Sequence, residues 1–335
     1  MYAIVDIWKL IGMLLIMAHH ITIIGVSGEY IFKSAWIYVE LFFIFTGYFT
    51  VKHFSLNIGN DCVDAAVRYT IKKFKVFLPY STIGIVLTYI IKNGHLLKEG
   101  IKPFIAGFAE IPFELLLVVS SFSDRRPLMA PLWYLSAMFV VFPLFCCFVQ
   151  MKHRNLLYLL SANIAMFYYG YIGVATVRTY PHDLLRAFSC MSLGVFIYSI
   201  SEHMKKYIFK RWVKIFLTIV EEGCLVFVIF STYNNWPIMR INLFCFVIAV
   251  SIIFSNQSYS QYIRSGIVSL ISRITMPLFL IHWGIGCYIG MLKLPLQYKI
   301  FIYYIASILC AVVCCLAVEF FRKRIKDINK YIFEI

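Results

Sequence analysis

Long apolar runs constrain most strongly what this chain can form. They cover residues 8–27, 35–54, 75–92, 103–122, 132–150, 156–175, 185–201, 213–231, 240–255, 274–292 and 299–321. Most have the length of roughly 17 to 25 residues with which a helix crosses a bilayer. Only 14 % of the residues are charged, whereas soluble domains carry about 25 %. The sequence therefore predicts an all-α, polytopic integral membrane bundle, built as a single transmembrane domain over residues 1–335.

The distribution of Lys and Arg indicates which runs cross the membrane. The segment 103–122 contains two prolines and two glutamates and is the poorest span. If it does not cross and the N-terminus lies inside, the basic loop 202–214 and the tail 322–335 both face inward. Leaving out Lys9, 19 Lys and Arg then lie inside and 11 outside, the excess expected of cytoplasmic loops. We expect about ten spanning helices, both termini cytoplasmic, and 103–122 as an outer-face or re-entrant helix.

The charge and the cysteines exclude other classes of protein. The net charge of +15 comes from basic residues that flank apolar runs, and no nucleic-acid-binding motif is present, so we expect no nucleic-acid partner. Most of the ten cysteines lie inside apolar runs, without a C-x-x-C motif or metal-ligand spacing to histidine. We therefore expect buried, reduced thiols and no metal site.

The first apolar run carries ionisable groups in the stretch "DIWKLIGMLLIMAHH". At about 100° per residue, Lys9 and His20 share one helix face and lie about 16 Å apart along its axis. Asp6 falls on the same face and is placed to form an ion pair with Lys9 or with another basic residue at the inner face, whereas His19 points away. Ionisable groups inside a membrane are unfavourable unless they face a cavity or a partner, which makes this stripe a candidate site. A structural His20 and a Lys9 that extends to the interface are the alternative.

Five segments together resemble the membrane-bound acyltransferase-3 family. Asp6, Lys9 and His20 match the pattern Asp-x-x-Arg/Lys, ten residues, His of its first helix. The other segments are, in family order, "VELFFIFTGYF", "YTIKKFKVFLPY", "PLWYLSAMFVVFPL" and "PLFLIHW". The chain departs from the pattern at Thr46, where Ser is usual, and at Met138, where some branches of the family carry Glu.

The resemblance implies a membrane-bound O-acyltransferase. We expect it to transfer an acyl group, acetyl from cytosolic acetyl-CoA, to a hydroxyl of a cell-surface or lipid-linked glycan. Acyl-CoA would be a co-substrate, with no permanently bound cofactor, and the carbohydrate or glycolipid acceptor and the lipid bilayer would be the other partners. The resemblance also implies an integral protein of a bacterial cell membrane.

The resemblance assigns roles to particular residues. His20 would be catalytic, as a base that activates the hydroxyl or as a relay that carries the acyl group. Cationic residues suit the polyanionic donor; Lys9 matches the family's donor-binding position, and the loop lysines match it more loosely. The predicted donor-binding residues are Lys9, Lys72, Lys73 and Lys75. For the loop lysines, topology signalling alone is the alternative. The predicted supporting residues are Asp6, Glu40 and His282, and a structural hydrogen bond is the alternative for the last two.

Other classes of function remain open at this stage. A transporter or flippase of a glycan or small molecule is the main alternative, but the repeated halves and paired broken helices of such proteins are not visible. A metal-dependent glycosyltransferase would need clustered carboxylates, and the chain has no D-x-D motif. Arg125 and Arg126 are predicted to lie outside, either in a solvated loop or against an anionic glycan.

Overall fold

The computed structural model describes residues 3–56, 61–108, 111–118, 127–172, 182–263 and 266–333. All regular secondary structure within these ranges is helical. The longer α-helices are α1 (Ala3–His19), α2 (Tyr38–Leu56), α3 (Cys62–Asn93), α7 (Leu132–Phe148), α8 (Arg154–Phe167), α9 (His182–Met204), α10 (Arg211–Tyr233), α11 (Met239–Ser255), α12 (Gly266–Met291) and α13 (Leu296–Phe333). The all-α prediction is confirmed for this part of the chain.

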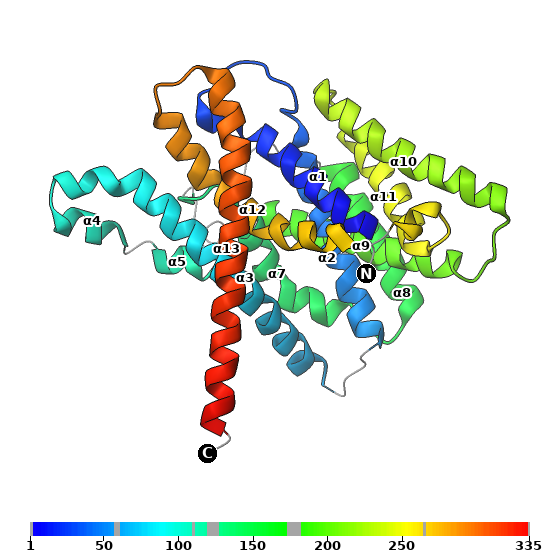
Figure 1. Cartoon of the computed structure of the whole chain (residues 1–335). Helices are drawn as coiled ribbons and strands as arrows, with labels where there is room; N and C mark the ends of the chain where they lie inside the picture. Colours follow the sequence, from blue (N-terminus) through cyan, green and yellow to red (C-terminus); the bar gives the residue numbers. More distant parts are fainter. Residues whose placement is uncertain are drawn as a thin grey trace.

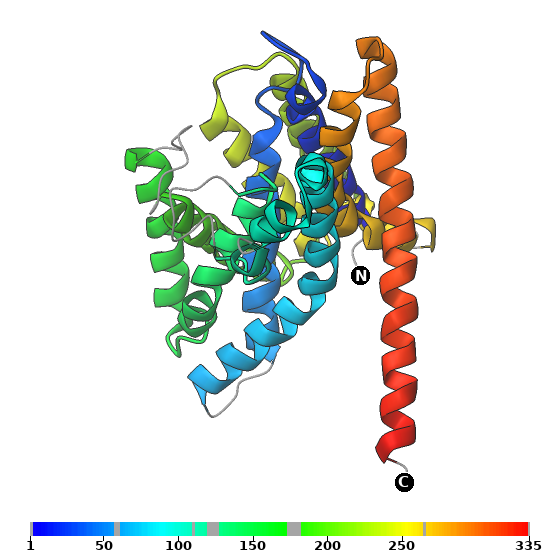
Figure 2. The same ribbon diagram turned by 90° about the vertical axis from the view of Figure 1, so that its left-hand side faces the viewer.

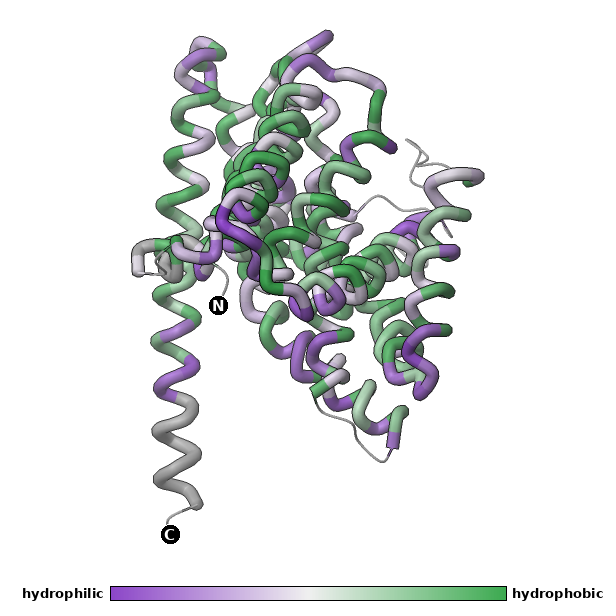
Figure 3. The backbone as a smooth tube through the Cα atoms, turned by 90° about the vertical axis from the view of Figure 1, so that its right-hand side faces the viewer, coloured by the Kyte–Doolittle hydropathy of each residue, from purple (hydrophilic) through white to green (hydrophobic). Residues whose placement is uncertain are grey.

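Among the residues that the structure describes, four helical segments are long and apolar enough to cross a membrane. They are Cys62–Lys98, His182–Met204, Ser272–Met291 and Leu296–Arg324, and two shorter apolar helices are Leu132–Phe148 and Met239–Ser255. Apolar residues line much of these helices, and hydrophilic stretches gather near the ends of helices (Figure 3). The described residues thus support an integral membrane bundle, while the count of about ten spans stays a prediction.

The first apolar run differs from the expected single helix over 8–27. α1 begins earlier and ends at His19, and the chain continues as the 3-10 helix η1 (Ile21–Ile24). The amide of His20 donates to the carbonyls of both Ile16 and Met17 at 3.1 Å, so the last turn tightens as it ends. The β-branched residues that follow are poor helix formers, and Gly25 adopts the left-handed conformation, with a φ of 101°, that terminates the segment.

The expected helix over 103–122 is wrong in its form. It is replaced by two short helices, α4 (Ile101–Gly107) and α5 (Ile111–Leu115), which follow the 3-10 helix η3 (Gly94–Lys98). Pro112 lies in the first turn of α5, where its missing N–H is tolerated. Neither helix is long enough to cross a bilayer, in agreement with the prediction that this segment does not span. Residues 119–122 lie outside the described part of the chain.

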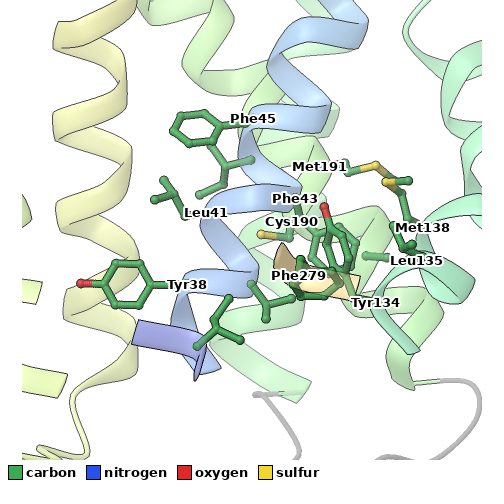
Figure 4. Packing of buried hydrophobic residues seen from close by; sticks show 14 of the residues in the cluster. Tyr38, Leu41, Phe43, Phe45, Tyr134, Leu135, Met138, Cys190, Met191 and Phe279 are labelled. Carbon is green, nitrogen blue, oxygen red and sulfur yellow. The ribbon is translucent and has the colours of Figure 1, made fainter. Parts of the chain in front are cut away.

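The bundle is built around α9, which packs against α2, α7, α8 and α11. α12 forms a second centre and contacts α1, α3 and α13. Glycines allow the closest of these crossings: a Cβ at Gly47 would overlap the backbone carbonyl of Met191 on α9, and one at Gly84 would lie 2.5 Å from the carbonyl oxygen of Leu280 on α12. Phe43 of α2, Tyr134 of α7 and Phe279 of α12 pack together in the core (Figure 4).

A proline within α3 leaves a carbonyl that another helix satisfies. Pro79 in α3 removes the hydrogen bond to the carbonyl of Lys75, and Arg322 of α13 donates to the carbonyls of Lys75 and Val76 at 3.4 and 3.1 Å. α13 stands at the edge of the bundle, and its C-terminal end projects beyond the other helices (Figures 1 and 2).

Candidate functional site

A pair of histidines joins α1 to α12. The Nδ1 atom of His20 lies 3.1 Å from the Nε2 atom of His282. The two rings are stacked, with centroids 5.3 Å apart and an interplanar angle of 18°. His282 is fully buried, whereas His20 is half-buried at the end of α1. The structure therefore brings together two residues that are 262 positions apart in the chain and that the sequence singles out.

The surroundings of His282 determine which nitrogen of His20 carries a proton. The Nδ1 atom of His282 lies 3.1 Å from the carbonyl oxygen of Leu278, which can only accept. A neutral His282 therefore has its proton on Nδ1 and presents its Nε2 lone pair to His20. The Nδ1 atom of His20 must then be the donor, and the lone pair of a neutral His20 ring is on Nε2. This tautomer is assigned from the hydrogen-bond network.

Trp283 packs against His20, and Lys92 packs against Trp283. The ring centroid of Trp283 is 5.3 Å from that of His20, and the rings meet edge to face at 88°. The Nζ atom of Lys92, on α3, lies 5.8 Å from the centroid of the Trp283 ring and donates to the carbonyl of Leu128 at 2.7 Å. The Nδ1 atom of His19 lies 2.6 Å from the carbonyl oxygen of Lys33, and its ring packs against that of His20 with centroids 5.0 Å apart.

A cavity of about 270 Å³ lies between α1, α2, α3, α7 and α12. Its wall is mostly apolar and includes the aromatic residues Phe42, Phe45, Phe49, Phe77, Phe142 and Phe279. Thr46 and Met138, the two departures from the family pattern, also line it. Phe43, Tyr134 and Phe279 lie close together where α2, α7 and α12 meet (Figure 4). The cavity is therefore largely apolar, as ligand pockets commonly are.

Two of the predicted donor-binding lysines line this cavity. They are Lys9 of α1 and Lys73 of α3. Lys9 forms the expected ion pair with Asp6, at 3.3 Å, and its Nζ atom lies over the rings of Phe45 and Phe49 at 5.8 and 5.5 Å. The Nζ atom of Lys73 lies over the ring of Tyr69 at 5.3 Å. The cavity thus has two cationic groups in a wall that is mostly apolar.

The structure separates the other two predicted lysines from the cavity. Lys72 and Lys75 are exposed on α3 and do not line it. Helical spacing explains the difference, because residues one or two positions apart point in different directions. Of the three loop lysines, only Lys73 therefore faces the same space as Lys9.

The cavity and the histidine pair are adjacent but distinct. The lining residues do not include His20 or His282. The connection is Phe279, which lines the cavity and whose ring centroid is 6.1 Å from that of His282. From the Lys9 side to His20, α1 rises about 16 Å. A ligand held by the lysines would therefore reach the histidines only with a part of its own structure that extends over this distance.

Glu40 does not belong to the cavity or to the histidine pair. It forms a buried ion pair with Arg186 of α9, at 2.5 Å from Nε to Oε1, and accepts a hydrogen bond from the hydroxyl of Tyr169 at 2.9 Å. The guanidinium lies between the rings of Trp36 and Trp133, 5.2 and 4.9 Å from their centroids. The structure therefore supports the helix–helix hydrogen bond as the role of Glu40.

Sequence reasoning missed three residues of these clusters. Arg186 is a single charge inside an apolar run, and this signal was available in the sequence. Trp283 directly follows His282, but an aromatic residue in an aromatic-rich helix is not a distinctive sequence signal. Lys92 lies at the expected end of a span and resembles a topology signal. Arg125 and Arg126 lie outside the described residues.

The fold defines an integral membrane protein of apolar helices. The chain belongs to the acyltransferase-3 family, because the family's acyltransferase domain matches residues 2–320. It is therefore a membrane acyltransferase, and the match gives the transporter alternative no support. No curated protein matches the chain. No solved structure matches it either.

Proposed function

We propose that this acyltransferase transfers an acetyl group from cytosolic acetyl-CoA to a hydroxyl of a cell-surface or lipid-linked glycan, with His20 as the catalytic residue. The observation that carries the proposal is the hydrogen bond between His20 and His282, which directs the Nε2 lone pair of a neutral His20 away from its partner. An imidazole held in one tautomer by its neighbour suits general-base chemistry.

The donor would bind at the cavity. The CoA phosphates are anionic, and Lys9 and Lys73 supply positive charge in a wall that is mostly apolar. The acyl group of CoA is carried on a long thiol arm, and such an arm suits the distance of about 16 Å that α1 covers between Lys9 and His20. Lys72 and Lys75 would contribute only at long range, because they are exposed.

The acceptor would meet the acyl group at His20. A sugar hydroxyl is a weak nucleophile, and the Nε2 atom of His20 can remove its proton as the hydroxyl attacks the thioester carbonyl. Alternatively, Nε2 can attack the thioester itself and carry the acyl group to the acceptor. In both routes His282 keeps the second nitrogen of His20 hydrogen-bonded.

The two ends of α1 suggest that the acyl group crosses the bilayer. With the N-terminus inside, Lys9 is on the cytoplasmic side and His20 lies beyond the midplane. A donor entering from the cytosol would then meet a glycan arriving from the other side. The enzyme would thereby acetylate an extracytoplasmic acceptor.

Membrane vesicles of defined orientation test the proposal. Radiolabelled acetyl-CoA is added to sealed inside-out and right-side-out vesicles that contain the protein, and label in the glycan and glycolipid fraction is measured. The expected result is labelling of inside-out vesicles only, because only there does the added donor reach the cytoplasmic face. Labelling of a cytosolic acceptor alone, or no label in either orientation, contradicts the proposal.

A further inference from the structure

The indole nitrogen of Trp283 has no hydrogen-bond acceptor among the described residues. Its Nε1 atom is buried although the ring as a whole is partly exposed. The N–H group therefore points into the protein and not toward its surface. Buried indole N–H groups normally find an acceptor, and one that lacks an acceptor needs an explanation.

Trp283 lies beside the proposed reaction centre. Its ring contacts that of His20 edge to face, with centroids 5.3 Å apart. The Nζ atom of Lys92 lies 5.8 Å from the ring centroid and is itself hydrogen-bonded to the carbonyl of Leu128. Lys92 and His20 thus both pack against the indole, which restricts how the ring can turn.

Acyl transfer needs a hydrogen-bond donor at this position. When a thioester carbonyl is attacked, its oxygen becomes an oxyanion, and enzymes stabilise that charge with N–H groups placed in advance. The N–H of His282 is engaged with the carbonyl of Leu278. The indole N–H of Trp283 is a buried donor in contact with His20 that has no acceptor among the described residues.

We propose that the Nε1–H group of Trp283 donates to the oxyanion formed at His20, a proposal that rests on the proposed function. The nucleophile forms a bond to the carbonyl carbon, and the π electrons move onto the oxygen that Trp283 stabilises. The electrons then return, the C=O bond re-forms and the C–S bond breaks. The CoA leaves as a thiolate, and His20 holds the proton of the acceptor hydroxyl until a product takes it.

The test removes the N–H group and keeps an aromatic ring. Trp283→Phe is compared with Trp8→Phe, because Trp8 is also buried and its Nε1 atom also lacks an acceptor among the described residues. Trp8 precedes His20 by twelve positions on α1, about 18 Å along the helix axis. Initial rates are measured in detergent over a range of acetyl-CoA concentrations, so that kcat and KM are obtained separately.

The expected result is a fall in kcat of about 10²- to 10³-fold in Trp283→Phe with KM unchanged, and wild-type kinetics in Trp8→Phe. A kcat of Trp283→Phe within threefold of wild type, or an effect confined to KM, overturns the proposal. If Trp283→Phe does not fold, Trp283 is replaced by benzothienylalanine, which keeps the shape and has sulfur in place of N–H. That variant must be impaired in the same way, and wild-type turnover overturns the proposal.

The experiment also separates this proposal from the proposed function. If wild type consumes acetyl-CoA and His20→Ala does not, the function holds, and the Trp283 variants alone decide the role of the indole. If folded wild-type protein consumes no acetyl-CoA, both proposals are overturned together.

Discussion

The Nδ1 atom of His20 donates a hydrogen bond to the Nε2 atom of His282, 3.1 Å away on α12. This contact connects the end of the first helix to a helix near the end of the chain. Because His282 is hydrogen-bonded to the carbonyl of Leu278 in its own helix, its ring orientation is fixed. The hydrogen bond between the two histidines then fixes the orientation of the His20 ring. His282 would therefore act as a positioning residue, comparable in role to a group that holds a catalytic imidazole in one tautomer.

Replacement of His282 tests this positioning role. His282→Phe removes the acceptor for the Nδ1–H group of His20, and turnover should fall by about 10²- to 10⁴-fold while donor binding is retained. His282→Gln offers an amide oxygen to the same N–H and should recover part of the loss. Turnover and donor affinity are measured on both purified variants. Equal activity of His282→Phe and wild type would show that His282 only fills space.

The lysines should differ in their effect on the donor. Lys73→Gln removes a cation that lines the cavity, and the Kd for acetyl-CoA should rise about 10-fold, the effect of one hydrogen bond to a charged group. Lys72→Gln and Lys75→Gln are matched controls on the exposed side of the same helix, and their affinity should stay within about twofold of wild type. Isothermal titration with a non-hydrolysable donor measures the three affinities. A larger effect at Lys72 or Lys75 than at Lys73 would disprove the assignment of the cavity as the donor site.

The Glu40–Arg186 pair should matter for stability. Glu40→Leu leaves a buried guanidinium without its carboxylate and should lower the free energy of unfolding by about 3–5 kcal/mol. Glu40→Leu combined with Arg186→Met removes both charges and should recover much of that loss. Thermal unfolding in detergent measures Glu40→Leu, Arg186→Met and the double variant. Glu29→Ala breaks an exposed ion pair with Lys33 and should change nothing measurable. A loss in the double variant equal to the sum of the single losses would contradict direct coupling.

The glycine crossing between α2 and α9 should not tolerate a methyl group. Gly47→Ala places a Cβ against the backbone carbonyl of Met191, so the two helices must move apart, and we expect a loss of about 1–3 kcal/mol or more. Gly223→Ala on α10 is the control, because a Cβ there meets nothing within 4 Å. Alanine should even stabilise that helix by about 0.5–1 kcal/mol. If Gly47→Ala and Gly223→Ala unfold at the same midpoint, the helices cross less closely than described.

Much of the fold could be predicted from the sequence, because helix formation in lipid follows from local apolar content. The expected runs 185–201 and 299–321 lie within α9 and α13. The end of α1 could not be predicted in the same way, because Ile21–Ile24 is as apolar as a span and its 3-10 geometry depends on local backbone packing. The two prolines of the segment 103–122 were a signal against one long helix, and α4 and α5 are short.

The candidate site could be predicted only in part. Helical periodicity correctly paired Asp6 with Lys9, since both lie in adjacent turns of one helix. It could not show that Lys73 alone among the loop lysines faces the cavity, because the rotation of α3 is set by its contacts with α7 and α12. The partner of His20 was likewise out of reach, because a contact across 262 positions depends on tertiary packing.

The central claim is that His20 carries out acyl transfer from acetyl-CoA. Substitution of His20, compared with substitution of the adjacent His19, tests it most directly. CoA release is measured with purified wild type, His20→Ala and His19→Ala at saturating donor. His19 is the adjacent control, because its Nδ1 atom lies 2.6 Å from the carbonyl oxygen of Lys33, while its ring also packs against that of His20. The account predicts release by wild type and His19→Ala and its loss in folded His20→Ala. Release by His20→Ala at the wild-type rate would contradict it.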